Sequence, residues 1–230
     1  MLSQNELKQQ VAEAAVHHIV PGLHQDTIIG VGTGSTVDRF IEAFAPHRHV
    51  FKAAVSSSER STEKMRALGI PVWDLNQVSH VACYIDGADE VDSQGMMIKG
   101  GGGALTREKI VASVADRFIC IVDHSKVVSA LGGFPVPVEV VPLAREAVAR
   151  QLRTMNGEPV WREGVVTDNG GHLLDVAGWQ LTSEQAIAME QRLNQIPGII
   201  TCGIFAQHAA QLVLVASQQG VQQQENHHEL

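Results

Sequence analysis

Cysteine is scarce in this sequence. The three cysteines, Cys83, Cys120 and Cys202, each lie within a short apolar run. An odd number of cysteines without C-x-x-C spacing argues against a disulfide framework and against a structural zinc site. We interpret all three as buried thiols in strands, which is typical of a protein kept in a reducing compartment.

Positive charge is also in short supply. The chain has 17 lysines and arginines against 25 aspartates and glutamates, and its formal net charge is -8. A nucleic-acid partner is disfavoured, because neutralising phosphates requires a basic face. A small anionic substrate remains open, since a local basic pocket can lie within an acidic surface.

Long apolar runs are absent. No stretch is long enough to span a bilayer, and the first residues, MLSQNE, lack the basic segment and apolar stretch of a signal peptide. We therefore expect a cytoplasmic protein without membrane attachment. Hydrophobic residues still make up 44% of the chain and charged residues 18%, enough to form a core.

Short apolar runs and helical patterns alternate along the first half of the chain. A capping box at Ser3–Glu6 opens the first helix, which Pro21 and Gly22 end. We predict strands at 27–31, 50–56, 80–86 and 117–123, and helices at 37–44, 59–68 and 105–115. This order predicts an α/β fold with a mainly parallel, Rossmann-like sheet and helices on both faces.

The pattern changes near residues 131–135. We predict strands at 136–141 and 199–205, helices at 143–155 and 183–194, and a hairpin at 165–176 with an Asn-Gly turn. This order is typical of a small α+β domain of the split-βαβ, ferredoxin-like type. We expect residues 1–130 and 207–230 to form the catalytic domain, with a returning strand at 212–215, and 131–206 a lid or oligomerisation domain. The polar end, 222–230, is expected to be frayed.

The segment Gly30–Thr36, GVGTGST, joins a predicted strand to a predicted helix. Its glycines allow close backbone approach, and the helix-start amides with the Ser35 and Thr36 hydroxyls can bind an anion. It is not a dinucleotide fingerprint, because Ser35 replaces the third glycine and no acid follows at the required distance. No lysine follows as in a Walker loop. A structural turn without a ligand remains an alternative.

The acidic segment Asp86–Asp92, DGADEVD, follows a predicted apolar strand. In open α/β sheets the carboxyl ends of parallel strands line the ligand site, which favours a functional role. A solvated acidic turn is the main alternative. Calcium binding is disfavoured because the spacing does not follow the EF-hand loop.

The segment Lys99–Lys109, KGGGGALTREK, contains four successive glycines. Such a run is costly in conformational entropy, so either close backbone approach or unusual backbone dihedrals must be needed there. A helix follows at once, and its free amides face the loop and favour the negative charge of Glu108. Glu108 can also be an ordinary helix-start acid, and Lys99 a strand-end lysine. In the strand-end cluster Asp123–Lys126, the lysine either meets a phosphate or faces solvent.

Together these segments resemble the ribose-5-phosphate isomerase family of the A type. The matching segments occur in the family's order and cover most of the chain from Gly30 to Phe205: GVGTGST at Gly30, SSS at Ser56, DGADE at Asp86, KGGGGALTREK at Lys99, DHSK at Asp123, FPVPVEVVP at Phe134 and GVVTDNGG at Gly164. One departure is Gly103, where the commoner family sequence has alanine.

The resemblance implies an aldose–ketose isomerase that needs no metal and no cofactor. It would interconvert D-ribose 5-phosphate and D-ribulose 5-phosphate through an enediolate, in the non-oxidative pentose phosphate pathway. The family is usually dimeric or tetrameric, and we expect a homodimer. The chemistry requires one positioned base and donors for the developing oxyanion, which a carboxylate and a lysine can supply.

The resemblance also implies residue roles. Glu108 would be the base that moves a proton between C2 and C1, and Lys99 would stabilise the enediolate oxygens. Asp86 would assist ring opening, and Asp89 would organise hydroxyls or the lysine. The remaining substrate contacts would come from Thr33, Gly34, Ser35, Thr36 and Lys126, with Lys8 as a further candidate, and from Gly87, Ala88, Gly100, Gly101 and Gly102.

The sequence disfavours two other classes of protein. Related sheet folds serve as sugar-phosphate sensors in transcriptional regulators, but this acidic chain shows no basic DNA-binding segment. A dinucleotide-dependent oxidoreductase is disfavoured by Ser35 and by the missing ribose-binding acid. These classes can share one fold, so the function must be inferred from the residues of the site.

Overall fold

The computed structural model describes residues 1–226 and forms two compact units. Unit 1 comprises residues 1–87, 107–126 and the chain from 210 onward, and unit 2 comprises 88–106 and 127–209. The sequence had placed 88–106 in the first domain. They belong to unit 2 because β4 (Glu90–Val91) and β5 (Met97–Ile98) form a three-stranded sheet with β11 (Ile204–Phe205), in the order β11-β5-β4.

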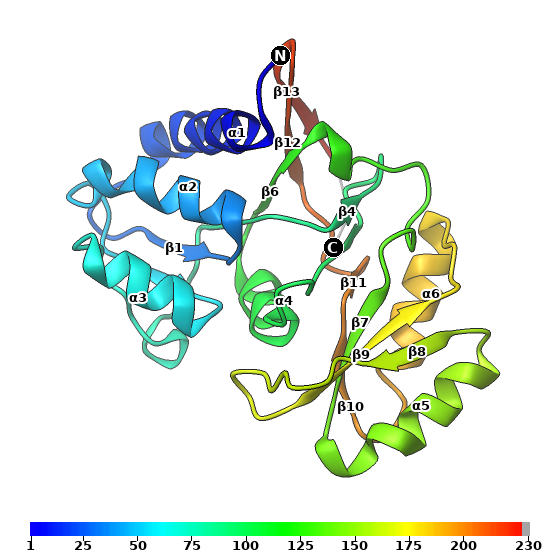
Figure 1. Cartoon of the computed structure of the whole chain (residues 1–230). Helices are drawn as coiled ribbons and strands as arrows, with labels where there is room; N and C mark the ends of the chain where they lie inside the picture. The colour runs from blue at the N-terminus through cyan, green and yellow to red at the C-terminus, as the bar shows by residue number, and fades with distance from the viewer. Residues whose placement is uncertain (227–230) are drawn as a thin grey trace. The chain divides into compact units, whose positions relative to one another are not determined.

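Unit 1 is built on a six-stranded sheet of order β13-β12-β6-β3-β1-β2 (Figure 1). Five strands are parallel and β13 is antiparallel to β12. The bounds are β1 Ile28–Val31, β2 Ala53–Ser56, β3 Cys83–Asp86, β6 Phe118–Asp123, β12 Leu212–Ser217 and β13 Gly220–Glu225. The predicted parallel sheet and the returning strand near 212–215 are confirmed.

The expectation of a frayed end from residue 222 is wrong for Gln222–Glu225. These residues pair with β12 along the edge of the sheet, from Gln222 opposite Val215 to Glu225 opposite Leu212. Backbone hydrogen bonds form the ladder whatever the side chains are, and polar side chains suit an exposed edge. Residues 227–230, which include the two histidines of the tail, lie outside the described residues.

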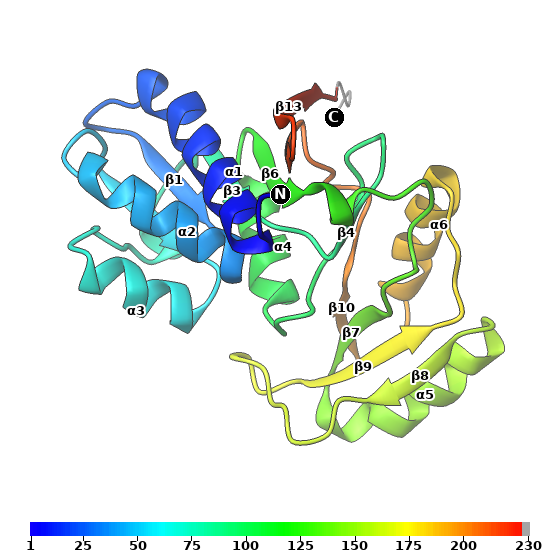
Figure 2. The same ribbon diagram turned by 45° about the horizontal axis from the view of Figure 1, so that its top comes forward.

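Helices cover both faces of the unit 1 sheet, as predicted. The helices α1 (Gln4–Ile19) and α2 (Ser35–Phe44) lie side by side (Figures 1 and 2) and share one core with Ile29, Ile85 and Ile119, to which α3 (Glu59–Ala67) adds Met65. The helix α4 (Leu105–Val114) packs on the other face, where a Cβ on Gly30 would lie 2.7 Å from Val111. Because strand side chains alternate, Tyr84 and Asp86 share that second face.

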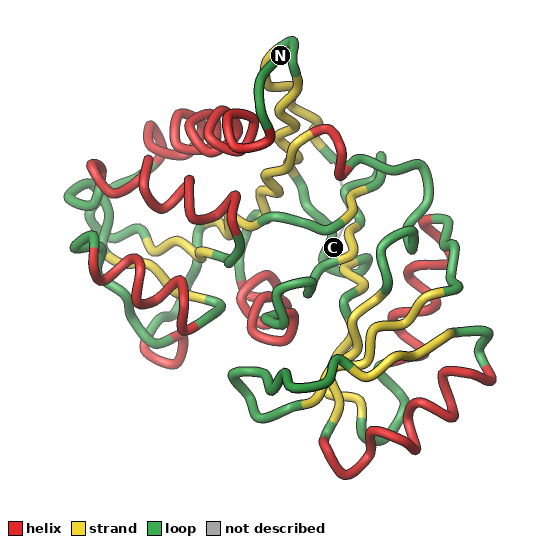
Figure 3. Tube along the Cα trace, viewed as in Figure 1, coloured by secondary structure: helices red, strands yellow, loops and turns green. Residues whose placement is uncertain are grey.

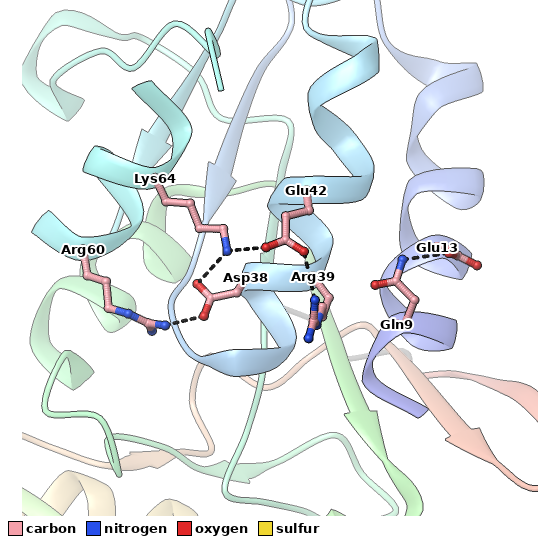
Figure 4. Close-up of polar contacts among 7 residues, drawn as sticks. All are labelled: Gln9, Glu13, Asp38, Arg39, Glu42, Arg60 and Lys64. Carbon is pink, nitrogen blue, oxygen red and sulfur yellow. Dashed lines mark hydrogen bonds and ion pairs between the residues drawn. The ribbon is translucent and has the colours of Figure 1, made fainter. Parts of the chain in front are cut away.

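Charged side chains join α2 to α3 on the surface of unit 1 (Figure 4). Lys64 Nζ lies 2.7 Å from Glu42 Oε1 and 3.8 Å from Asp38 Oδ1, and Arg60 also pairs with Asp38. Within α1, Gln9 donates a hydrogen bond to Glu13. Partly exposed ion pairs of this kind contribute little stability, typically below about 1 kcal/mol each. The apolar core therefore fixes the packing of these helices.

Unit 2 contains a four-stranded antiparallel sheet of order β10-β7-β9-β8 (Figure 3). Its elements follow in the order strand, helix, strand, strand, helix, strand, which is the predicted split-βαβ arrangement. The bounds are β7 Val136–Val140, α5 Arg145–Thr154, β8 Glu158–Trp161, β9 His172–Ala177, α6 Ser183–Leu193 and β10 Ile199–Cys202. Short 3-10 turns lie at Val20–Gly22, Ala45–His47, Leu75–Gln77, His124–Lys126 and Pro142–Ala144.

Two predictions about unit 2 are corrected. The hairpin arm predicted at residues 165–167 lies in a loop, and the partner strand of β9 is β8; Val165 and Val166 are exposed and have no core to pack on. The single strand predicted at 199–205 is interrupted at Gly203, where a Cβ would lie 2.2 Å from the carbonyl oxygen of Lys99.

Among residues 1–226, no helix is long and apolar enough to cross a membrane.

Candidate active site

The carboxyl ends of three neighbouring parallel strands, β1, β3 and β6, meet at one edge of the unit 1 sheet. The GVGTGST turn (residues 30–36) follows β1, Asp86 ends β3 and Asp123 ends β6. Gly34 precedes α2 with φ +114°, a conformation that favours glycine. The edge therefore combines a helix start suited to anions with carboxylates, as strand ends in such sheets commonly do.

Asp86 is fully buried and held by three donors. Its Oδ1 accepts from the amides of Gly87 at 2.7 Å and Thr33 at 3.2 Å, and its Oδ2 accepts from the Tyr84 hydroxyl at 2.5 Å. A Cβ on Gly32 would lie 1.9 Å from the Asp86 Cγ, so only glycine leaves room for the carboxyl group. The second glycine of the turn thus serves Asp86 directly.

Tyr84 is a site residue that the sequence analysis missed. It is the single tyrosine of the chain and is completely buried. Burial, followed by the charges of Asp86 and Glu108, raises the pKa of Tyr84 well above its usual range. The hydroxyl therefore stays protonated as a donor close to two carboxylates. The available signal was its position two residues before Asp86, on the same face of the strand.

Glu108 is the fourth residue of α4 and only 4% exposed. The helix packs on the sheet face that carries Tyr84 and Asp86, and the charge of Glu108 acts on the Tyr84 hydroxyl. Unit 1 therefore brings the two predicted carboxylates, Asp86 and Glu108, to one side of the sheet around a shared tyrosine.

Lys126 and Lys8 are half-buried in unit 1. Asp123 Oδ1 accepts from the Ser125 amide at 3.0 Å and from its hydroxyl at 2.5 Å. Burial alone would raise the pKa of Asp123, but the bonds from Ser125, the charge of Lys126 and a bond from Gln4 outweigh it and lower the pKa. Lys8 follows Gln4 by one helical turn on α1, so both side chains lie on the helix face toward Asp123.

In unit 2, Lys99 follows β5 directly and is 3% exposed. Its amide donates to the Gly203 carbonyl at 2.9 Å, and its Nζ lies 5.5 Å from the centroid of the Phe205 ring. The short strand β11, which the sequence analysis did not separate from its neighbour, thus places Lys99. A cation over an aromatic face is a favourable arrangement.

The glycine loop, residues 100–103, is a tight turn closed by a bond from the Gly103 amide to the Gly100 carbonyl at 2.9 Å. Gly100 and Gly103 have φ +105° and +83°, which explains two of the four glycines. Asp89 Oδ2 accepts from the Gly101 amide at 2.8 Å, and a Cβ on Gly101 would lie 2.7 Å from Asp89 Oδ1. In this structure Asp89 therefore organises the loop.

Arg162 is a second residue that the sequence analysis missed. Its Nη1 donates to the carbonyls of Gly101 at 3.0 Å and Gly100 at 3.3 Å. Asp175 orients the guanidinium, accepting from Nε at 2.8 Å and from Nη2 at 2.5 Å. Arg162 lies about sixty residues from the loop along the chain, and no motif surrounds it that would have indicated this contact.

The predicted site residues divide between the two units. Unit 1 holds Glu108, Asp86, Thr33, Gly34, Ser35, Thr36, Gly87, Lys126 and Lys8, and unit 2 holds Ala88, Asp89, Lys99, Gly100, Gly101 and Gly102. The chain passes from one set to the other between Gly87 and Ala88 and between Thr106 and Arg107. Within residues 1–226, no three histidine, cysteine, aspartate or glutamate side chains are grouped so that they could hold a metal ion.

The α/β fold, with buried carboxylates at a sheet edge near a helix start suited to anions, is typical of an enzyme that acts on an anionic substrate. The family model "Ribose 5-phosphate isomerase A (phosphoriboisomerase A)" matches residues 53–220. Ribose-5-phosphate isomerase A of Bordetella petrii is 56% identical over 225 residues, which are 98% of this chain and 99% of the relative. The chain therefore belongs to the ribose 5-phosphate isomerase A family, as its motifs predicted, and it is an isomerase.

Solved structures agree with this assignment. That of ribose 5 phosphate isomerase A from Neisseria gonorrhoeae is 44% identical, with a TM-score of 0.92 over 99% of this chain and 100% of its own. A D-ribose-5-phosphate isomerase solved in complex with phospho-erythronic acid is 34% identical, with a TM-score of 0.90 over 98% of this chain and 100% of its own. Both likenesses cover the two units.

Proposed function

We propose that this enzyme interconverts D-ribose 5-phosphate and D-ribulose 5-phosphate with Glu108 as the base. Its carboxylate is buried, lies in the first turns of α4 and acts on the same tyrosine that holds Asp86. This observation carries the proposal, because aldose–ketose exchange needs a positioned base shielded from bulk water. The pathway that supplies and consumes these sugars would be the non-oxidative pentose phosphate pathway.

The reaction moves one carbon-bound proton. Glu108 takes the proton from C2 of the open-chain aldose, the electron pair forms the C1–C2 double bond of an enediolate, and the same carboxyl returns the proton to C1. A hydroxyl proton moves from O2 to O1, so the ketose forms without net gain or loss. Lys99 would stabilise the oxyanion, since donors aimed at developing charge lower the barrier. Gly100, Gly101 and Gly102 would supply backbone contacts to the substrate.

Asp86 would assist opening of the sugar ring. Its three donors fix the carboxylate in one orientation, which a group that must exchange a proton with a particular sugar oxygen requires. Asp89 would act on the glycine loop through the Gly101 amide and so shape the backbone that meets the sugar hydroxyls. Gly87 and Ala88, between these two acids, would supply further backbone contacts.

The phosphate would lie at the start of α2. Thr33, Gly34, Ser35 and Thr36 provide amides and hydroxyls there, and helix starts favour anions. Lys126, whose charge lowers the pKa of Asp123 at the end of β6, would supply one cation, and Lys8 on α1 would supply a second. If Lys126→Ala left the Michaelis constant for ribose 5-phosphate unchanged, Lys126 would lose this role.

The decisive test is turnover by the Glu108→Gln variant. The parent enzyme should convert ribose 5-phosphate to the ketose in the presence of EDTA. Glu108→Gln keeps the shape but removes the basicity, so we expect normal folding, near-normal substrate binding and a loss of turnover of at least about a hundredfold. Exchange of the C2 proton with solvent deuterium should be lost in parallel. A variant within a few-fold of the parent would place the base elsewhere, with Asp86 next in line.

Assembly and location are further parts of the proposal. We expect a cytoplasmic homodimer in which unit 2 contributes to the contact or acts as a lid. Unit 2 carries apolar side chains that are strongly exposed in the single chain, including Leu143 at 97% and Val160 at 65%. Exposed apolar residues of this kind commonly mark contacts between copies. Light scattering during size-exclusion chromatography would give the mass, and a monomer at working concentrations would contradict the dimer.

A further inference from the structure

Glu139 is a buried carboxylate that the proposed reaction does not use. It lies in β7 with 0% exposure. Its Oε2 accepts from the Thr106 hydroxyl, and its Oε1 accepts from the Thr167 hydroxyl at 2.5 Å and from Asn169 Nδ2 at 3.3 Å. Burying a carboxylate is costly unless hydrogen bonds compensate. An apolar side chain would fill this strand position at lower cost, so the retained carboxylate requires an explanation.

The first partner of Glu139 belongs to the helix of the proposed base. Thr106 is the second residue of α4, and Glu108 follows two residues later. The side chains of Ser3, Ser58 and Thr182 cap α1, α3 and α6, whereas Ala104, which precedes α4, has no side-chain oxygen. Glu139 therefore holds the first turn of α4 through Thr106, and its charge suits the positive end of a helix.

The other partners of Glu139 belong to the loop 167–171. There the Thr167 hydroxyl also accepts from the Gly171 amide at 2.9 Å and from the Asn169 amide at 3.3 Å. A Cβ on Gly171 would lie 2.5 Å from Glu139 Oε1, so this position needs glycine. One carboxylate thus joins three of the family segments. In two of them, FPVPVEVVP and GVVTDNGG, the proposed mechanism uses no residue.

We propose that Glu139 is a positioning residue for Glu108. By fixing Thr106, it sets the start of α4 and with it the direction in which the base leaves the helix. This inference rests on the proposed role of Glu108. The competing explanation is that Glu139 only stabilises the loop 167–171, and the two explanations differ in which of its hydrogen bonds matters for turnover.

Two matched variants separate these explanations. The variants are Thr106→Val and Thr167→Val. Valine has nearly the same shape as threonine, so each variant removes one hydroxyl donor to Glu139 with little change in packing. We expect Thr106→Val to lower kcat by about tenfold or more with KM within about twofold, because small displacements of a reacting group are costly. Thr167→Val also loses two hydrogen bonds inside its loop, so its Tm should fall at least as far as that of Thr106→Val. Its kcat should stay within about twofold of the parent.

Thr106→Ser restores the hydroxyl and should restore kcat. Hydrogen exchange at the amides of Glu108 and Lys109, the first that can bond within the helix, should be faster in Thr106→Val than in Thr167→Val. This readout does not depend on activity. Should Thr106→Val not fold, Thr106→Ala takes its place in the same comparison. An unchanged kcat in the folded Thr106 variant, or an equal loss of kcat in Thr167→Val, would overturn the proposal.

The Glu108→Gln variant keeps this test apart from the test of function. If Glu108→Gln is inactive and Thr106→Val turns over normally, the positioning role fails and the base assignment stands. If Glu108→Gln remains active, the base assignment fails, and with it the reason for Glu139 to affect turnover.

Discussion

At the scale of single residues, the contact between Gly32 and Asp86 leaves no room for a side chain at position 32. The carboxyl group occupies the space of a side chain at position 32, so Gly32→Ala must displace it. We expect the free energy of unfolding to fall by about 1–3 kcal/mol, as for other overpacked sites. Turnover should fall as well, because Asp86 loses the orientation set by the Thr33 amide.

Gly22 provides the control for this substitution. A Cβ at Gly22 would meet no atom within 4 Å, so Gly22→Ala should leave stability within about 0.5 kcal/mol of the parent and activity unchanged. Urea unfolding and initial rates measure both effects. Equal stability and equal turnover for the two variants would show that the site tolerates a side chain at Gly32.

The sequence predicts those candidate site residues that lie within local motifs. Asp86 and Lys99 adjoin glycines and strand ends, Glu108 lies in the first turns of the helix after the glycine loop, and all three are buried. The structure assigns Asp89 a contact with the glycine loop, which the sequence did not anticipate. Tyr84, Arg162 and Glu139 were missed, although Tyr84 stands close to Asp86. Arg162 and Glu139 contact partners tens of residues away, which no local pattern can reveal.

At the scale of elements, strand β3 contains two groups that make the fold sensitive to alkali. Burial raises the pKa of the Cys83 thiol from 9.0 to about 12, and burial also raises the pKa of Tyr84 well above its usual range. Unfolded chains release these protons at lower pH than the folded protein does. The stability that these groups contribute is therefore present below pH 9 and is lost as the pH rises toward about 12.

Cys83→Ala tests this directly. Its unfolding free energy should decline less steeply between pH 9 and about 12 than that of the parent, because one of the two titrating groups is gone. Urea unfolding at a series of pH values gives the slopes. Identical slopes for parent and variant would show that Cys83 titrates alike in the folded and unfolded chains.

Elements with strong end signals were predicted well. The capping box at Ser3 starts α1 as expected, and α3 and α6 begin at predicted positions. The hairpin was misplaced because Val165 and Val166 have strand-forming side chains but no partner strand to bury them. The sheet β11-β5-β4 was missed because its strands are two residues long, shorter than any periodicity can reveal.

At the scale of the whole molecule, substrate should stabilise the fold by mass action. A ligand that binds only the folded protein adds about 2.7 kcal/mol at a hundredfold excess over its Kd. We expect ribose 5-phosphate, the proposed substrate, to raise the Tm of the parent and of Glu108→Gln, because the variant should still bind it. Lys126→Ala should need a higher concentration for the same rise. Equal protection of parent and Lys126→Ala would remove Lys126 from the phosphate site.

The strand order of the unit 1 sheet also determines when this protein can fold during synthesis. Strand β12 pairs with β6 on one side and with β13 on the other, and both β12 and β13 lie in the last part of the described chain. The ribosome must therefore release more than two hundred residues before the edge of β6 finds its partner, and non-local pairing of this kind is slow. Until then the apolar β6 edge is open to other chains, so we expect truncated or stalled products to be claimed by chaperones and proteases.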